Sequence, residues 1–370
     1  MSARAAVGLA LLIVTPCCAM AQKVPVVRLK PADARLDEEF TSLSSVRELS
    51  DGRVLIADWQ ENRLVVANLR DGTVKAVGRT GSGPGEFRGL YQLFVLGRDS
   101  TLVPDLRARR WLLLDGVSVV VTLPPETPVL RVAPILLGAD EAGHVLTMGV
   151  VRPGPREPAD PAESVYVVRA DRATGRADTV GRILPQPSQV EVRERNPDGS
   201  PRTVTGNTLM LSASEQALLF LDGWIAFARL NPYRVDWRTS DGRIVRGAAL
   251  PVPVDKVDDR EKRAYVERSA RQSGRPPRDP ATITSWSPTV APFQTQGALL
   301  ASSDGRLVIH RMQTASAPHT RYDVVDRRGA LAGQVSMPEN ERIVGFGAKS
   351  VYVAVTDDDG IQRLRRHPWP

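Results

Sequence analysis

Two neighbouring stretches decide the fold of this chain, IADWQENRLVV at 56–66 and GRTGSGPGEF at 78–87. Parts of both belong to a repeat with a period of 47 residues: the Glu-Phe pair at 39–40 returns at 86–87, and Asp58 with Arg63 returns as Asp105 with Arg110. Short apolar runs carry this repeat. A period of this length in such runs predicts a β-propeller built of four-stranded blades.

Apolar alternation bounded by turn residues divides the chain into blades. In the first blade Asp51-Gly52 and Asp71-Gly72 form the hairpins, because Asp-Gly supplies the positive φ angles that tight turns require. Its strands are expected at 43–49, 53–58, 63–69 and 73–77. Further blades are expected at 91–123, 135–184, 217–250 and 297–336, and a last blade has three strands, at 342–346, 351–356 and 361–366.

The extended run Val24 to Leu29 is expected to supply the fourth strand of the last blade. Such pairing would join the two ends of the chain and leave no exposed sheet edges. The sequence therefore predicts an all-β fold, a six-bladed β-propeller. Its blades are four-stranded and antiparallel, the N-terminal strand closes the ring, and one short helical insertion interrupts the pattern.

The first 21 residues have the pattern of a secretory signal peptide. Arg4 precedes an apolar run over 7–14, and Ala19-Met20-Ala21 matches a cleavage site, so the mature chain would begin at Gln22. The apolar run is shorter than the roughly 20 residues that span a bilayer. We expect a secreted or periplasmic protein after cleavage between Ala21 and Gln22; a lipid anchor on Cys17 or Cys18 is the alternative.

Residues 22–370 are expected to form a single propeller domain with insertions at 152–163, 185–214 and 251–293. Both cysteines lie in the signal segment, so the mature chain has no disulfide and no thiolate metal ligand. The formal net charge is +7, and six lysines leave 43 arginines among 49 basic residues. Acids are interspersed with these arginines and no basic run with interleaved aromatics occurs, so we expect no nucleic-acid partner. No segment after the signal could span a membrane, and a monomer is expected.

The stretches 56–66 and 78–87 resemble NHL-type repeats. In that family an apolar strand ends in Asp, Arg follows five residues later, and a Gly-Pro-Gly-x-Phe linker leads to the next blade. The Asp-to-Arg element recurs at Asp358 with Arg363, recurs with Arg in place of Asp at Arg229 with Arg234, and has one further possible equivalent, Arg321. The chain resembles secreted, largely uncharacterised six-bladed propellers of bacteria. Their relatives include sensor domains, RNA-binding domains and a few lyases and lactonases, so the resemblance implies a fold and no particular reaction.

Strand direction separates two faces of such a propeller. The turns between second and third strands lie with the inter-blade linkers on one face, and the other hairpin turns lie on the opposite face. Every insertion falls on the first face, which we call the insertion face, as do the Asp-to-Arg loops. Insertions gathered on one face of a repeat protein mark its binding face. Free drift of linker length is the alternative.

The largest insertion contains the one clear helical stretch, at 255–272, followed by a breaker-rich connector at 274–280. As a lid, this helix would bring four arginines toward an anionic ligand: Arg260, Arg263, Arg268 and Arg271. As a solvated helix on the rim, it would pair its arginines with acids of its own: Asp258, Asp259, Glu261 and Glu267.

The candidate binding residues are arginines, because the planar guanidinium donors suit carboxylate, sulfate or phosphate. In the structural alternative, each Asp holds the arginine of its own hairpin, in the pairs Asp58–Arg63, Asp105–Arg110 and Asp358–Arg363. For Arg229 and Arg234 we find no acid within the hairpin, so an external anion is expected there. The candidate set is Arg229, Arg234, Arg63, Arg110, Arg363 and Arg263.

No catalytic residue, metal ligand or cofactor is predicted. The four histidines have no H-x-x-x-H spacing, Gly81-Ser82-Gly83 lacks the flanking glycines of a nucleophile elbow, and the acidic turn 357–360 lacks alternating calcium ligands. We expect a binding or interaction module whose insertion face takes a protein, a glycan or a small anionic ligand. The alternative is a metal-dependent, lactonase-like hydrolase or lyase that would use a divalent metal at the channel mouth.

Overall fold

The computed structural model describes residues 25–133, 135–149, 164–294 and 297–370. The expected signal peptide and the expected insertion at 152–163 lie outside these ranges. Within them, nearly all regular structure is antiparallel β-strand, and strands that follow one another in sequence pair side by side. No helix of the described residues is long and apolar enough to cross a membrane.

Two four-stranded meanders follow the expected order. The first consists of β3 (Leu43–Glu48), β4 (Val54–Asp58), β5 (Arg63–Asn68) and β6 (Thr73–Ala76). The second consists of β9 (Phe94–Val95), β10 (Ser100–Asp105), β11 (Arg110–Asp115) and β12 (Ser118–Leu123). Most strand ends agree with the expected ones to within a few residues because the turns are well specified: Gly52 has φ 84° and Gly72 has φ 73°.

The next two meanders share one eight-stranded sheet, because Gly138 and Leu219 form a parallel bridge between their first strands. One comprises β13 (Leu136–Ala139), β14 (His144–Gly149), β15 (Val165–Asp171) and β16 (Ala177–Ile183). The other comprises β19 (Gln216–Leu219), β20 (Ile225–Leu230), β21 (Tyr233–Arg238) and β22 (Ile244–Arg246). A side chain at Gly138 would collide with the backbone of Leu219, so glycine permits this close approach.

The last two sheets include the ends of the described chain. One contains β23 (Leu299–Ala301), β24 (Leu307–His310), β25 (Thr320–Val325), β26 (Leu331–Met337) and β1 (Val26–Val27). The other contains β27 (Glu341–Phe346), β28 (Ser350–Thr356), β29 (Gln362–Pro368) and β2 (Ala34–Phe40).

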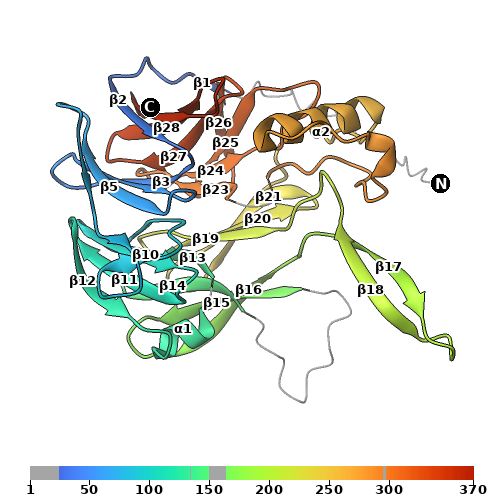
Figure 1. Cartoon of the computed structure of the whole chain (residues 1–370), viewed down its shortest axis with the longest axis horizontal. Helices are drawn as coiled ribbons and strands as arrows, with labels where there is room; N and C mark the ends of the chain where they lie inside the picture. The colour runs from blue at the N-terminus through green and yellow to red at the C-terminus, as the bar shows by residue number, and fades with distance from the viewer. Residues whose placement is uncertain (1–24, 134, 150–163, 295–296) are drawn as a thin grey trace, which may run out of the picture.

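The meanders succeed one another around a central cavity, as in a β-propeller. Figure 1 shows β3, β13, β19 and β23 toward the middle of the molecule and β12 at its edge. The cavity measures about 670 Å³, and first strands of successive sheets line it through Val46, Phe94, Leu218, Leu300 and Phe346. Apolar side chains fill the spaces between adjacent sheets, which is where the hydrophobic core lies.

The N-terminal pairing differs from the prediction. Val26 and Val27 pair in parallel with β26, and the strand beside β29 is β2 instead. The expectation that Val24 to Leu29 completes the last sheet was therefore wrong. The physical reason is amphipathicity: Leu36 and Phe40 of β2 are 1% exposed, whereas Val26 is 64% exposed. The charged residues between Leu36 and Phe40 conceal this strand in the sequence.

The insertions contain structure of their own. The 185–214 segment forms the projecting hairpin of β17 (Ser188–Arg195) and β18 (Pro201–Thr208), which the sequence did not predict (Figure 1). The 251–293 segment contains α2 (Asp259–Ser273) and the short η1 (Pro280–Thr282). Helix α2 begins later than expected because Asp258 caps it by accepting a hydrogen bond from Glu261 N, and Gly274 in the left-handed conformation ends it. A five-residue helix, α1 (Pro128–Val132), was not predicted either.

Candidate functional site

The repeated aspartates hold the linkers between sheets. The Asp58 carboxylate accepts hydrogen bonds from the backbone N–H of Thr41 at 2.7 Å and of Ser42 at 3.2 Å. Asp105 accepts the corresponding bond from Arg88 N at 3.0 Å. Both aspartates are buried, at 0% and 1% exposure. Their recurrence thus has a structural cause: each buried carboxylate is satisfied by N–H groups of a linker and holds that linker in place.

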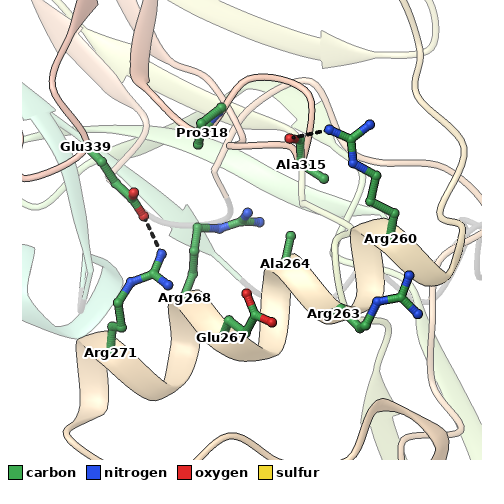
Figure 2. A pocket seen from close by; sticks show the side chains of 9 residues that line it. All are labelled: Arg260, Arg263, Ala264, Glu267, Arg268, Arg271, Ala315, Pro318 and Glu339. Carbon is green, nitrogen blue, oxygen red and sulfur yellow. Dashed lines mark hydrogen bonds and ion pairs between the residues drawn. The ribbon is translucent and has the colours of Figure 1, made fainter.

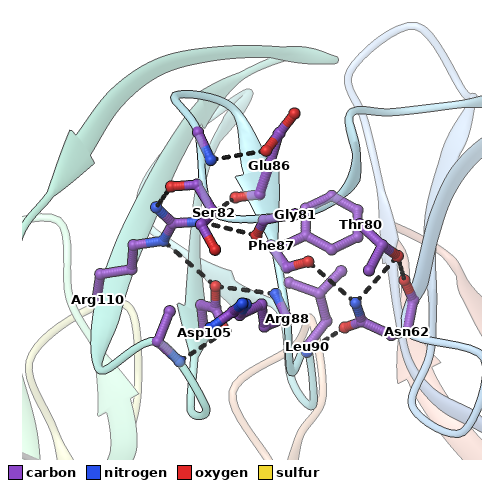
Figure 3. Close-up of polar contacts among 12 residues, drawn as sticks. Asn62, Thr80, Gly81, Ser82, Glu86, Phe87, Arg88, Leu90, Asp105 and Arg110 are labelled. Atoms are coloured by element: carbon purple, nitrogen blue, oxygen red, sulfur yellow. Dashed lines mark hydrogen bonds and ion pairs between the residues drawn. The ribbon is translucent and has the colours of Figure 1, made fainter.

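Arg110 binds the glycine-rich linker itself (Figure 3). Its Nε lies 3.3 Å from Asp105 Oδ2, and its guanidinium donates to the carbonyls of Ser82 at 2.8 Å and Glu86 at 2.7 Å. Two short strands at the ends of this linker, β7 (Arg79–Thr80) and β8 (Glu86–Phe87), pair in parallel. The expected Asp105–Arg110 pair is confirmed, and it stabilises the loop that joins the first two meanders.

Asn62 secures the other end of the same linker. It has a left-handed φ of 51°, its Nδ2 donates to Phe87 O at 3.0 Å, and its Oδ1 accepts from Leu90 N at 3.1 Å (Figure 3). Sequence reasoning did not single out this residue. The signal was present in the motif, because Asn tolerates positive φ better than most other residues.

Two of the three expected Asp–Arg pairs do not form. Arg63 pairs with Glu38 of β2, while Asp58 is occupied by backbone N–H groups. Arg363 pairs with Asp357 at 2.7 Å and with Glu39, and Asp358 is exposed. The arginines are nevertheless neutralised within the protein. Their carboxylate partners on β2 lie far away in the sequence, so hairpin spacing could not reveal them.

Arg229 and Arg234 also have acids, contrary to the prediction. Arg234 Nε donates to Asp236 Oδ1 at 2.9 Å, and this hydrogen bond raises the pKa of Arg234. Arg229 donates to Glu215 at 2.8 Å and to Asp236 at 3.4 Å. Asp236 belongs to the same hairpin, two residues beyond Arg234, and was overlooked. The reason for expecting an external anion at Arg229 and Arg234 therefore no longer holds.

A different cluster of arginines lines a groove beside helix α2. The cavity measures about 300 Å³ and lies between α2, the loop at Ala315 and Pro318, and Glu339 (Figure 2). We call it the α2 groove. The helix contributes Arg260, Arg263, Ala264, Glu267, Arg268 and Arg271 to its lining.

The groove arginines have few carboxylate partners. Arg271 pairs with Glu339 at 2.8 Å (Figure 2), but Arg260 donates to Ala315 O at 3.2 Å and Arg268 to Gln313 O at 3.0 Å, both neutral carbonyls. Arg268 is 8% exposed, and burial lowers its pKa. The exposed side chain of Arg263 has no hydrogen bond or ion pair in the described part of the chain.

Among the described residues the acids of α2 form no ion pair with these arginines, although the charge of Glu261 acts to raise the pKa of Arg268. Asp258 caps the helix, buried Glu261 accepts Ala315 N at 2.9 Å with both oxygens, and Asp259 pairs with Lys262 at 3.3 Å. The expectation that acids of the helix pair with its arginines is therefore wrong for these three. Glu267 lines the groove without a carboxylate–guanidinium ion pair among the described residues.

The histidines lie in separate environments. His144 contacts Asp140 at 2.9 Å, and the partly buried His367 contacts Lys30 O at 2.8 Å. His310 stacks on Tyr322 with ring centroids 4.7 Å apart, and burial, with a contribution from Arg342, lowers its pKa to about 4. Within the ranges that the structure describes, no three or more His, Cys, Asp or Glu residues gather as a potential metal site.

No protein-family model matches the sequence, and no curated protein matches it. Similar solved structures include a member of the DUF4221 family from Bacteroides vulgatus, with 10% identity, a TM-score of 0.48 and coverage of 91% of this chain and 96% of that one. A catalytically inactive virginiamycin B lyase from Staphylococcus aureus with quinupristin has 12% identity, a TM-score of 0.42 and coverage of 91% and 98%.

A calcium-binding regucalcin from Agrobacterium tumefaciens has 12% identity, a TM-score of 0.36 and coverage of 94% of this chain and 97% of its own. At such identities and scores, none of these similarities indicates a shared ligand or reaction.

Proposed function

We propose that the protein is a secreted or periplasmic β-propeller that binds an anionic ligand in the α2 groove. The observation that carries this proposal is Arg268. This residue is 8% exposed and lines the groove, and its guanidinium donates to a carbonyl, not to a carboxylate. Within the described part of the chain Arg268 forms no direct ion pair, and the carboxylates of Glu261 and Glu339 act on its charge only at longer range. An anion in the groove would give this buried cation a direct partner.

The arrangement of the groove suits a carboxylate-bearing ligand. Arg260 and Arg271 are eleven positions apart on α2, which corresponds to about 16 Å along a helix. Guanidinium groups spaced over that length would bind successive acidic groups through charge-assisted hydrogen bonds. The ligand class is therefore a small polycarboxylate or an acidic segment of a larger partner.

The remaining candidates take structural roles in this proposal. Arg63, Arg110, Arg229, Arg234 and Arg363 each contact a carboxylate of the protein, so a ligand would have to displace an existing ion pair. Of the predicted binding residues only Arg263 belongs to the proposed site, where it lines the α2 groove together with Arg260 and Arg268. The proposed site thus stays on the insertion face and moves to the helical insertion.

Secretion rests on the sequence of the first 21 residues, with its apolar run and its Ala19-Met20-Ala21 cleavage pattern. The absence of cysteine from residues 22–370 suits an oxidising compartment, where free thiols are liable to react. We expect N-terminal sequencing of the protein from culture supernatant or periplasm to begin at Gln22.

Binding is tested by isothermal titration calorimetry with citrate as the probe. We expect the intact protein to bind citrate and Arg263→Gln to weaken binding about tenfold, because a hydrogen bond to a charged group contributes about 1.5–3 kcal/mol. Arg328→Gln is the matched control, since Arg328 is an exposed arginine on a different loop, paired with Asp326. An equal loss in both variants would point to non-specific attraction and contradict the proposal.

We further propose that the meanders form six blades and that β2 closes the ring. The pairing of β2 with β29 and the contact of β27 with β3 support this closure. Phe40→Ala is expected to destabilise the fold by about 3–5 kcal/mol, the cost of truncating a buried phenylalanine. Val26→Ala, at a 64% exposed position, should change stability by less than about 0.5 kcal/mol. Urea denaturation measures both, and equal effects would refute closure by β2.

A further inference from the structure

In five of the meanders an arginine lies at the start of the third strand, and the partners of these arginines can be compared from sheet to sheet. The arginines lie at the first or second position of β5, β11, β21, β25 and β29, and they are Arg63, Arg110, Arg234, Arg321 and Arg363. Four of them have a carboxylate partner. Arg63 pairs with Glu38, Arg110 with Asp105, Arg234 with Asp236, and Arg363 with both Asp357 and Glu39. Arg321 is the member of this series without one.

The side chain of Arg321 has no hydrogen-bond or ion-pair partner in the described part of the chain, although it is only partly exposed. Its Nε is buried and makes no hydrogen bond. The carboxylate two residues away, Asp323, is already occupied: it accepts from Tyr233 Oη at 2.8 Å, Gln334 Nε2 at 2.7 Å and Arg311 Nη1 at 3.2 Å. The acid that would have served Arg321 therefore serves a different set of donors.

A second arginine, Arg311, lies opposite Arg321 on the neighbouring segment. Arg311 N donates to Arg321 O at 2.8 Å, so the two residues face each other across β25 and the segment after β24. Burial lowers the pKa of Arg321, and the charge of Arg311 lowers it further, while Asp323 and Asp255 act in the opposite direction. Asp255 forms no ion pair with Arg321 among the described residues. Of the two arginines, only Arg311 forms an ion pair with Asp323, and Arg321 forms none among the described residues.

We infer that Arg321, with Arg311 beside it, binds a single oxoanion or carboxylate group on the insertion face. The site lies between β21, which contributes Tyr233, and β25, next to the start of the 251–293 insertion at Asp255. An anion there would accept hydrogen bonds from the terminal nitrogens of the Arg321 guanidinium and would reduce its repulsion with Arg311. This site is separate from the α2 groove, whose lining includes neither arginine.

The test compares Arg321→Met with Arg234→Met, which removes a paired arginine from the equivalent strand. Methionine preserves much of the arginine stem's volume without its charge. The melting temperature Tm is measured for each protein in sodium chloride, sulfate, phosphate and acetate at equal ionic strength. Sulfate and phosphate represent tetrahedral oxoanions, and acetate represents a carboxylate, so the three arms distinguish the two sources of the anion.

In chloride, Arg321→Met is expected to leave Tm unchanged or raised, because the lost charge had no partner, while Arg234→Met lowers Tm. In the intact protein and in Arg234→Met, at least one of the three anions should raise Tm by on the order of 2 °C over chloride. Arg321→Met should lose that rise.

Two results would overturn the inference. One is an intact protein whose Tm is the same in all four salts. The other is an Arg321→Met protein that keeps the full anion-dependent rise, because the rise would then reflect a general salt effect. Arg263→Gln serves as the control for the α2 groove and should retain the rise, so failure of the groove proposal and failure of this one are distinguishable.

Discussion

Two groups of arginines on the insertion face differ in what neutralises them. The hairpin arginines, such as Arg110 and Arg229, contact carboxylates and backbone carbonyls of the protein. The groove arginines Arg260 and Arg268 contact carbonyls alone, and Arg263 has no partner among the described residues. The first group recurs with the sheets and the second belongs to an insertion.

This difference separates stability from binding. An arginine that recurs in equivalent hairpins can form an ion pair with an acid of the same or a nearby strand. Four of the five arginines at the start of third strands do so. An insertion is free of that constraint, so its charges can remain available to a ligand. Arginine content alone therefore says little about function; the presence or absence of a carboxylate partner is the informative quantity.

The largest expected effect is on a repeated aspartate. Asp105→Ala would leave Arg88 N without its acceptor and Arg110, whose side chain is 11% exposed, without its counter-ion. Breaking a buried pair in this way costs about 3–5 kcal/mol. Asp358→Ala, the equivalent but exposed position, should stay within about 0.5 kcal/mol of the intact protein in urea denaturation. A small effect of Asp105→Ala would remove the structural role of the repeat.

A smaller loss is expected from Arg229→Ala. It removes hydrogen bonds to Glu215 and Arg182 O, at 2.8 and 2.6 Å, from a side chain that is 20% exposed. We expect about 2 kcal/mol of destabilisation and citrate binding within twofold of the intact protein. Loss of citrate binding in a folded Arg229→Ala protein would place this arginine among the ligand-binding ones.

The smallest expected effect is a pH dependence in the linker. Hydrogen bonding from Gly83 N, with Arg79 as a second donor, holds the pKa of Glu86 below its ordinary value of 4.5. A depressed carboxyl pKa contributes stability that is present above the ordinary pKa and is lost as pH falls through the folded value. The difference in Tm between the intact protein and Glu86→Gln should therefore shrink below pH 4.5. A constant difference would show that the Glu86 charge is irrelevant.

Strand positions were predictable because local chemistry specifies them. Asp-Gly turns require positive φ, and the structure has φ 84° at Gly52 and 94° at Gly242. Expected strands such as 63–69 accordingly coincide with observed ones such as β5. The prediction failed at β2, where ARLDEEF reads as a polar segment although Leu36 and Phe40 share a buried face.

The partners of the arginines could not be derived in the same way. Arg363 of β29 pairs with Glu39 of β2, from the opposite end of the chain. Arg63 of β5 pairs with Glu38, also of β2. Such contacts depend on which strand completes a sheet, and the predicted N-terminal strand was the wrong one. Asp236 was different, since it lies two residues from Arg234 and strand alternation places both on one face.

The most direct measurement is citrate affinity in two single variants, Arg263→Gln in the groove and Arg363→Gln in a hairpin. Both remove one positive charge from a partly or fully exposed side chain on the insertion face. We expect the dissociation constant to rise about tenfold in Arg263→Gln and to stay within twofold of the intact protein in Arg363→Gln. A rise in Arg363→Gln with none in Arg263→Gln would contradict the assignment of binding to the unpaired arginines of the α2 groove.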